Sequence, residues 1–178
     1  EGLVVHAERD RGRVADMVQT AVKKYGFRGI KVHRHDAPIS REICEVAAHF
    51  NLPVLYDVVG EVATIELFAR QYPKVNFIIP HLGSFADDWK AQLAITDHLI
   101  RHDNVFTDTS GVRRFDLLLH CYRRAGASKI IFGSDGPWLH PGVELHKVFC
   151  LKAPAAATER MLSGNILDLI GAKTTALR

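Results

Sequence analysis

The strongest constraint on the fold is an unbroken alternation of strand-like and helix-like segments. Short apolar, β-branched runs suggest strands at 2–6, 27–33, 53–57, 75–79, 104–108 and 129–133. Helical spacing of apolar residues suggests helices near 13–25, from Ser40 onward, and at 61–72, 86–102, 113–125, 143–150, 155–163 and 164–171. Because no linker or low-complexity tract interrupts the pattern, residues 1–178 are predicted to form one domain. Such strand–helix units in series require a parallel sheet with right-handed crossovers.

Two architectures satisfy this pattern, an open doubly wound sheet and a (β/α)8 barrel. The open sheet usually carries a glycine-rich phosphate loop after its first strand, and neither GxGxxG nor GxxxxGK is present. Almost every predicted strand instead ends in a polar side chain that can bind a ligand: His6, Lys31, His33, Asp57, His81, Asp108 and Asp135. Functional groups at the ends of many different strands favour the barrel.

Six strand–helix units fall short of eight, and a complete barrel takes about 250 residues. The sequence therefore predicts a (β/α)8-type barrel that lacks its first two units, in a chain that is the later part of a longer protein. Strands 2–6 and 129–133 are then expected to be open edges, which are sites of pairing with other chains. We expect a homo-oligomer, or aggregation of the isolated chain.

Composition narrows the possible partners. The apolar content of 47%, the charged content of 24% and the net charge of +3 are typical of a soluble globular protein. No run of Lys or Arg is longer than two residues, so a nucleic-acid partner is not expected. No apolar stretch approaches the ~18 residues of a membrane span. The cysteines Cys44, Cys121 and Cys150 lie far apart within apolar helical patterns, which predicts reduced, buried thiols in a cytoplasmic protein.

Two strand ends carry the best candidate catalytic residues. The run 130–132 stops at Gly133 and is followed by Asp135, and the run 75–80 is followed by His81. Imidazole and carboxylate suit a divalent ion such as zinc, which lowers the pKa of a bound water to about 7. A histidine that is not a ligand can act as the general base beside it. The alternatives are an Asx-turn at Asp135 and a helix cap formed by His81 through Ser84.

Other residues near the strand ends have two interpretations each. A buried Lys31 needs a partner carboxylate such as Asp57, or carboxylation into a metal bridge, unless it extends to solvent. His33 is a candidate substrate contact, although most loop histidines are only solvated. Trp138 either lines the pocket or covers the barrel rim. Asp108 is interpreted mainly as the organiser of a turn.

Several blocks together resemble one known family. The segments GFRGIKVH, NLPVLYD, PKVNFIIPHLG, NVFTDTSG, KIIFGSDGP and GNILDLIG occur in the order and spacing of the amidohydrolase-2 branch of the amidohydrolase superfamily. That branch includes aminocarboxymuconate-semialdehyde decarboxylase and related decarboxylases and hydrolases. The resemblance implies a distorted (β/α)8 barrel with one metal, usually zinc. It also implies that His81, in the HxG motif, is the general base and that Asp135 is a metal ligand.

The chain departs from the family pattern in two places. The HxH ligand pair of the first strand is absent, and Asp57 stands where the family usually has a ligand histidine, so Asp57 is the corresponding metal-ligand candidate. The predicted function is metal-dependent hydrolysis of a small carbonyl-containing or anionic substrate, with Lys31, His33 and Trp138 as substrate contacts. The alternatives are nonoxidative decarboxylation on the same scaffold and a non-catalytic binding or scaffold subunit.

Overall fold

The computed structural model describes residues 2–85 and 88–172, and its centre is a parallel sheet. Six strands follow one another in chain order, β1 to β6, without any exchange of neighbours. Their bounds are β1 Gly2–Val4, β2 Gly29–His33, β3 Val54–Asp57, β4 Phe77–Ile79, β5 Val105–Asp108 and β6 Ile130–Ile131. An open doubly wound sheet reverses its strand order at a switch point, whereas a barrel wall does not. The order therefore matches the predicted barrel.

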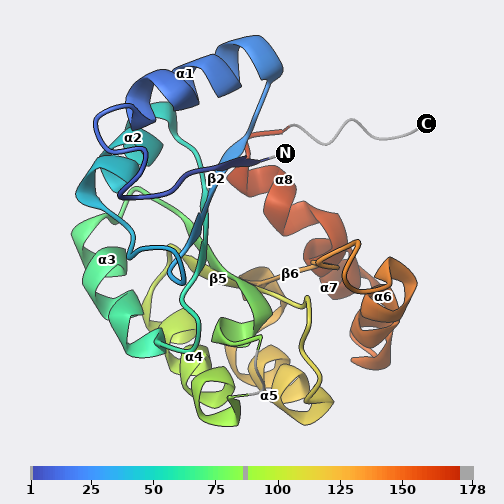
Figure 1. Cartoon of the computed structure of the whole chain (residues 1–178). Coiled ribbons are helices and arrows are strands. Elements are labelled where there is room, and N and C mark those ends of the chain that lie inside the picture. Colours follow the sequence, from blue (N-terminus) through green and yellow to red (C-terminus); the bar gives the residue numbers. More distant parts are fainter. Residues whose placement is uncertain (1, 86–87, 173–178) are drawn as a thin grey trace.

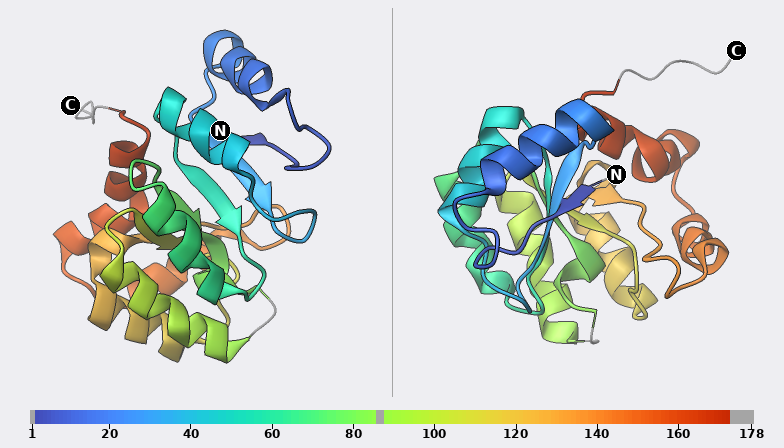
Figure 2. Two further views of the ribbon diagram at one scale, coloured as in Figure 1. Left: turned by 90° about the vertical axis from the view of Figure 1, so that its left-hand side faces the viewer. Right: turned by 45° about the horizontal axis from the view of Figure 1, so that its top comes forward.

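Helices connect consecutive strands and continue after the last one. Their bounds are α1 Val14–Tyr25, α2 Arg41–Phe50, α3 Ile65–Gln71, α4 Trp89–Arg101, α5 Phe115–Ala125, α6 Pro141–Cys150, α7 Ala155–Glu159 and α8 Asn165–Leu169. Helices α1 to α5 succeed one another around one side of the curved sheet (Figures 1 and 2). Every predicted helix is present, but 61–72 begins as a 3-10 turn at 62–64, and a π-type turn at 160–164 separates α7 from α8.

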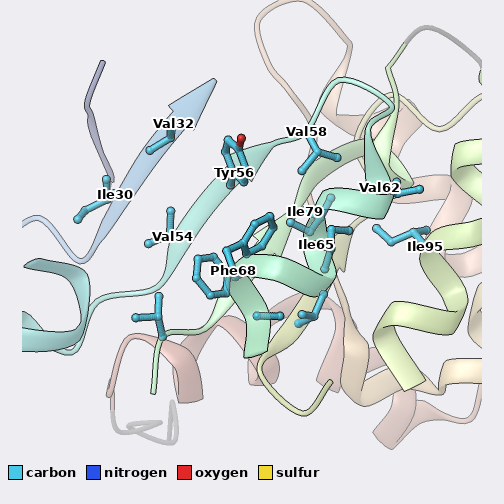
Figure 3. Packing of buried hydrophobic residues seen from close by; sticks show 14 of the residues in the cluster. Ile30, Val32, Val54, Tyr56, Val58, Val62, Ile65, Phe68, Ile79 and Ile95 are labelled. Carbon is cyan, nitrogen blue, oxygen red and sulfur yellow. The ribbon is translucent and has the colours of Figure 1, made fainter. Parts of the chain in front are cut away.

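The core lies between the sheet and these helices. Ile30 and Val54 alternate along β2 and β3 with half-buried residues that face the opposite side of the sheet. Phe68 of α3 packs against the rings of Tyr56 and Phe77, with centroid distances of 5.3 and 4.7 Å (Figure 3). Each fully buried side chain of this size contributes about 1.5–3 kcal/mol. One face of the sheet thus packs against the helices, and the other carries the polar residues of the strand ends.

Local signals define the helix ends. The Ser40 hydroxyl accepts a hydrogen bond from the Ile43 backbone N–H at 3.3 Å, which caps α2 as the sequence suggested. Helix α1 ends at Gly26, whose φ of 70° is the left-handed conformation that glycine adopts without penalty. Asp88 caps α4 by accepting from the backbone N–H groups of Lys90 and Ala91.

The two edges of the sheet, β1 and β6, are the predicted ones, but they differ. The Phe132 N–H donates to the Met161 carbonyl at 2.7 Å, and the Asn165 amide donates to the Ile130 carbonyl at 2.7 Å. The segment after α7 therefore satisfies the outer groups of β6. In the described part of the chain, β1 pairs with β2 alone and its outer edge is open.

One cysteine differs from its prediction. All three thiols are free, and Cys44 and Cys121 are buried, but Cys150 is exposed. The prediction of a third buried thiol was wrong because α6 turns Val148, and not its last residue, toward the core.

None of the helices in residues 2–85 and 88–172 has the length and apolar character needed to cross a membrane.

Candidate active site at the carboxyl ends of the strands

His81 lies in a strained turn directly after β4. Its φ is 60° and that of Leu82 is 50°, so two consecutive non-glycine residues are left-handed, at about 1–2 kcal/mol each. Burial holds this turn in place, because Leu82 is fully buried and His81 is only 7% exposed. A Cβ on Gly83 would lie 2.5 Å from the side chain of Val62, so only glycine fits the end of the turn. Strained backbone of this kind clusters at functional sites.

The ring of His81 has a defined tautomer. Its Nδ1 atom lies 2.8 Å from the Ser110 carbonyl oxygen and 3.0 Å from the Ser110 hydroxyl. A carbonyl only accepts hydrogen bonds, so Nδ1 carries the proton and Nε2 of the neutral ring keeps a free lone pair. The Phe85 ring packs edge-on against the imidazole at 5.0 Å. The alternative of a helix cap through Ser84 is wrong, because Asp88 caps α4.

Asp108, at the end of β5, organises the turn as the sequence suggested. Its Oδ1 accepts from the backbone N–H of His81 at 3.0 Å, from the backbone N–H of Ser110 at 3.0 Å and from the Ser110 hydroxyl at 2.7 Å. Burial raises the pKa of this carboxyl above its ordinary value, against the opposing effect of nearby His81. A Cβ on Gly133 would lie 2.9 Å from Asp108 Oδ2, so the glycine at the end of β6 lets the two strand ends approach.

Two residues of α6 support the loop after β5, and sequence reasoning missed both. The Glu144 carboxylate accepts from the Gly111 N–H at 2.9 Å and pairs with Lys147 Nζ at 2.6 Å. Lys147 in turn donates to the carbonyls of Thr109 and Val112 at 3.1 and 3.0 Å. In the sequence, this pair looks like an ordinary exposed helix pair, so only its spatial position reveals the role.

His33 and Asp57 are neighbours across β2 and β3. They are in register, and His33 Nδ1 lies 3.7 Å from Asp57 Oδ2. The other oxygen, Asp57 Oδ1, accepts from the Val59 N–H at 2.9 Å. Asp57 is thus the partner of His33 and not of Lys31. The half-buried Lys31 instead lines a cavity of about 340 Å³ together with Asp108.

Asp135 and Trp138 lie on the loop after β6. Asp135 has a φ of 49° and precedes the cis peptide bond between Gly136 and Pro137. Asp135 is half-buried, and its carboxylate accepts no hydrogen bond from the described residues, whereas Ser134 Oγ accepts from the Gly136 N–H. The alternative of an Asx-turn at Asp135 is therefore wrong. Trp138 is 87% exposed, which places its side chain on the rim and not in a pocket.

His6 makes a local turn after β1. Its backbone N–H donates to Asp10 Oδ2 at 2.9 Å, and its Nδ1 accepts from the backbone N–H groups of Glu8 and Arg9. Arg9 also pairs with Asp10 at 2.9 Å. Nδ1 of the His6 ring therefore accepts its hydrogen bonds within this turn.

A mononuclear metal site needs at least three protein ligands, which the described strand-end residues do not bring together. His33 and Asp57 are the close pair, but in the described chain no third histidine, cysteine or carboxylate joins them within 4.8 Å, and Asp135 is not brought into such a group. The group of described residues that meets this distance is Glu66 of α3, His98 of α4 and His102, which directly follows α4. The residues described at the strand ends do not make a complete metal site by themselves.

Solved structures share this fold at low sequence identity. An uncharacterized TIM-barrel protein from Bordetella bronchiseptica superposes with a TM-score of 0.76 at 14% identity, covering 94% of this chain and 65% of that chain. A putative 2-pyrone-4,6-dicarboxylic acid hydrolase from Pseudomonas putida gives 0.68 at 17% identity, covering 94% and 71%. A dihydroxybenzoic acid decarboxylase from Polaromonas, solved with bound manganese and the inhibitor 2-nitroresorcinol, gives 0.63 at 17% identity, covering 88% and 64%.

These likenesses confirm the (β/α)-barrel fold, and the chain spans about two thirds of the length of these structures. No curated protein sequence matches the chain. The amidohydrolase family model matches residues 2–172, nearly the whole sequence. Together with the strand-end histidine and aspartates, this match means that the chain belongs to the amidohydrolase family, in its amidohydrolase-2 branch.

Proposed function

We propose that this chain forms the larger part of a metal-dependent hydrolase in which His81 is the general base. The observation that carries the proposal is the contact of 2.8 Å between His81 Nδ1 and the Ser110 carbonyl oxygen. The Nδ1–H of His81 is held by the Ser110 carbonyl, so Nε2 is available to accept a proton. Because the ring is already held in one orientation, it does not have to reorient when a substrate binds. A base positioned in this way is more effective than the same base free in solution.

The chemistry assigned to the chain's own residues is a proton transfer. Nε2 of His81 takes a proton from a water that attacks the substrate carbonyl, and the imidazolium then returns it to the leaving group. The Ser110 carbonyl continues to accept from Nδ1–H throughout. A family metal, when bound, would polarise the carbonyl or the water.

The predicted substrate is small and either carbonyl-containing or anionic, and one contact near His81 supports an anionic one. The guanidinium of Arg113 lies over the Phe85 ring at 6.0 Å, and this same ring contacts His81. The arrangement brings a positive charge to the neighbourhood of the base, where it favours a substrate that carries a carboxylate.

Zinc is our proposed ion, while the Polaromonas relative was solved with manganese. Because the described strand ends gather only the pair His33 and Asp57, metal binding there requires further ligands.

We also propose that the chain forms a homo-oligomer joined at the open strand edge. All three thiols are free, which supports the proposal of a reducing, cytoplasmic location.

A second candidate is nonoxidative decarboxylation, favoured by the structural likeness to the dihydroxybenzoic acid decarboxylase. In that reaction no water is added. The bond between the ring carbon and the carboxylate breaks, carbon dioxide leaves, and a proton must be delivered to the ring carbon, a task that protonated His81 can perform.

The test offers 2-pyrone-4,6-dicarboxylic acid and dihydroxybenzoic acids to the chain in the presence of zinc or manganese. Hydrolysis yields a new carboxylate, whereas decarboxylation releases carbon dioxide. Substitution His81→Asn is expected to lower the rate about 10²- to 10⁴-fold, the usual contribution of a general base. Substitution His49→Asn, at an exposed position of α2, is the matched control and should change little.

Equal rates in the His81→Asn and His49→Asn variants would refute the role of His81. Turnover of neither substrate class, in a protein that also supplies the further ligands and holds a stoichiometric metal at the strand ends, would favour a non-catalytic binding or scaffold subunit.

A further inference from the structure

A cluster of metal-binding side chains lies on the helical layer, away from the strand ends. His98 lies in the last turn of α4, and His102 is the extended residue that directly follows the helix at its C-terminal end. Their rings are stacked, with centroids 6.0 Å apart and planes within 13°. Glu66, on α3, completes the group, and one ligand atom from each of the three residues lies within 4.8 Å of the others. Figure 1 shows α3 and α4 side by side on the outside of the sheet.

His98 has an unmet bonding requirement at this place. Its side chain is 7% exposed, and its buried Nδ1 has no hydrogen-bond partner in the described chain. Buried polar atoms without a partner are rare and call for an explanation. Burial also lowers the pKa of His98, which keeps the imidazole in the neutral form that a metal requires.

We propose that Glu66, His98 and His102 form a zinc site that fastens α3 to α4. Two histidines and a carboxylate, with water in the fourth position, are a common ligand set for this ion. In a tetrahedral site with bonds near 2.0 Å, ligand atoms stand about 3.4 Å apart. His102 Nε2 and Glu66 Oε2 are already 2.9 Å apart, so the ion would replace the proton between them, and His98 would move inward.

The positive charges of two arginines lie near Glu66 and would repel a bound zinc ion. Removing one of these charges therefore provides a control. Glu66 accepts from Arg70 at 3.3 Å and faces Arg101 at 3.8 Å. Both arginine side chains are exposed, by 73% and 58%, so these pairs are weak and the guanidinium groups are free to turn into solvent. Their charge should still weaken the site, and the substitution Arg101→Gln is therefore expected to tighten binding.

The site is independent of the proposed hydrolysis and can be tested without a substrate. Zn²⁺ is titrated into the 178-residue chain by calorimetry, and Co²⁺ is added in a parallel experiment to record its visible absorption. We expect about one equivalent of Zn²⁺ to bind and Co²⁺ to give the intense bands of a four-coordinate site. The His102→Gln and Glu66→Gln variants should each lose about 100-fold or more in affinity, since even the loss of an outer-shell partner costs 10- to 100-fold.

Matched variants distinguish this site from the strand ends. Asp135→Asn and His33→Asn should bind Zn²⁺ like the parent chain, and His49→Gln tests for weak surface histidines. If His98→Asn fails to fold, the partly exposed His102 and Glu66 still report on the site, and Zn²⁺ should raise the melting temperature of the parent but not of His102→Gln. The proposal is overturned by less than about a tenth of an equivalent bound in the folded parent, by unchanged affinity in His102→Gln and Glu66→Gln, or by loss of binding in Asp135→Asn alone.

Discussion

Replacement of Asp108 tests whether its carboxylate holds the His81 turn together. One oxygen, Oδ1, accepts three hydrogen bonds: two from backbone N–H groups, of His81 and Ser110, and one from the Ser110 hydroxyl. Asp108→Ala removes this acceptor and leaves two buried N–H groups unpaired. Asp108→Asn keeps an oxygen at the same position, and an amide oxygen can accept the same three bonds.

The expected loss in the free energy of unfolding differs between Asp108→Ala and Asp108→Asn. Each buried donor left unpaired costs about 1–3 kcal/mol, so Asp108→Ala should lose about 2–6 kcal/mol of the free energy of unfolding. Removal of a buried carboxylate offsets part of this loss, because burial disfavours its charge and raises its pKa. Asp108→Asn should therefore lose no more than about 1 kcal/mol, the net value of one hydrogen bond.

Urea unfolding at neutral pH measures these differences, and nitrogen chemical shifts of the imidazole report which His81 nitrogen is protonated. The Nδ1–H form should persist in Asp108→Asn. The pH dependence gives a second readout. Since the folded carboxyl binds its proton more tightly than the unfolded one, the folded state holds more protons between the two pKa values, and parent stability should fall as pH rises through that window. This fall should vanish in Asp108→Asn.

Equal losses in the two Asp108 variants would refute this account, because the oxygen at this position would then not be what holds the turn. A parent whose stability rose with pH through that window, relative to Asp108→Asn, would contradict the burial effect.

Three further outcomes are expected. The pKa of Asp10 is held low, chiefly by Arg9, so stability should decline as pH falls below the ordinary carboxyl range, and Asp10→Asn should flatten that decline in acid unfolding curves. Iodoacetamide should label the exposed Cys150 quickly in the folded chain and spare Cys44 and Cys121, because burial raises the pKa of these two thiols to about 12. Mass spectrometry identifies the labelled sites. Rapid labelling of all three thiols would contradict the buried positions of Cys44 and Cys121. Light scattering should show assembly of the chain, and the substitution Val4→Lys in β1 should weaken that assembly. A monodisperse parent monomer would count against pairing at that edge.

The fold was predictable because its signals are local. β-Branched runs and helical apolar spacing placed every strand and helix, and the order of the units left few topologies to choose from. The same logic placed His81 and Asp108 at the carboxyl ends of neighbouring strands, where the structure joins them through one hydrogen bond. Their proximity follows from parallel pairing alone.

The rest depended on distances between elements that no periodicity specifies. The support of the Ser110 loop by Glu144 requires the packing angle of α6, and the approach of Glu66 to His98 requires the offset between α3 and α4. The alternative that paired Lys31 with Asp57 was wrong for a related reason, since the strand register sets Asp57 opposite His33. Sequence reasoning identified the polar residues at the strand ends but not the helices that hold them.

The unequal edges of the sheet determine what kind of assembly the chain can enter. Met161 and Asn165 occupy the outer groups of β6, so β1 is the edge left for pairing in the described chain. A molecule with two free edges grows head to tail into open filaments, whereas one with a single free edge can only pair with the same edge of a second copy. If self-association uses this edge, the described residues by themselves should assemble no further than a two-fold dimer.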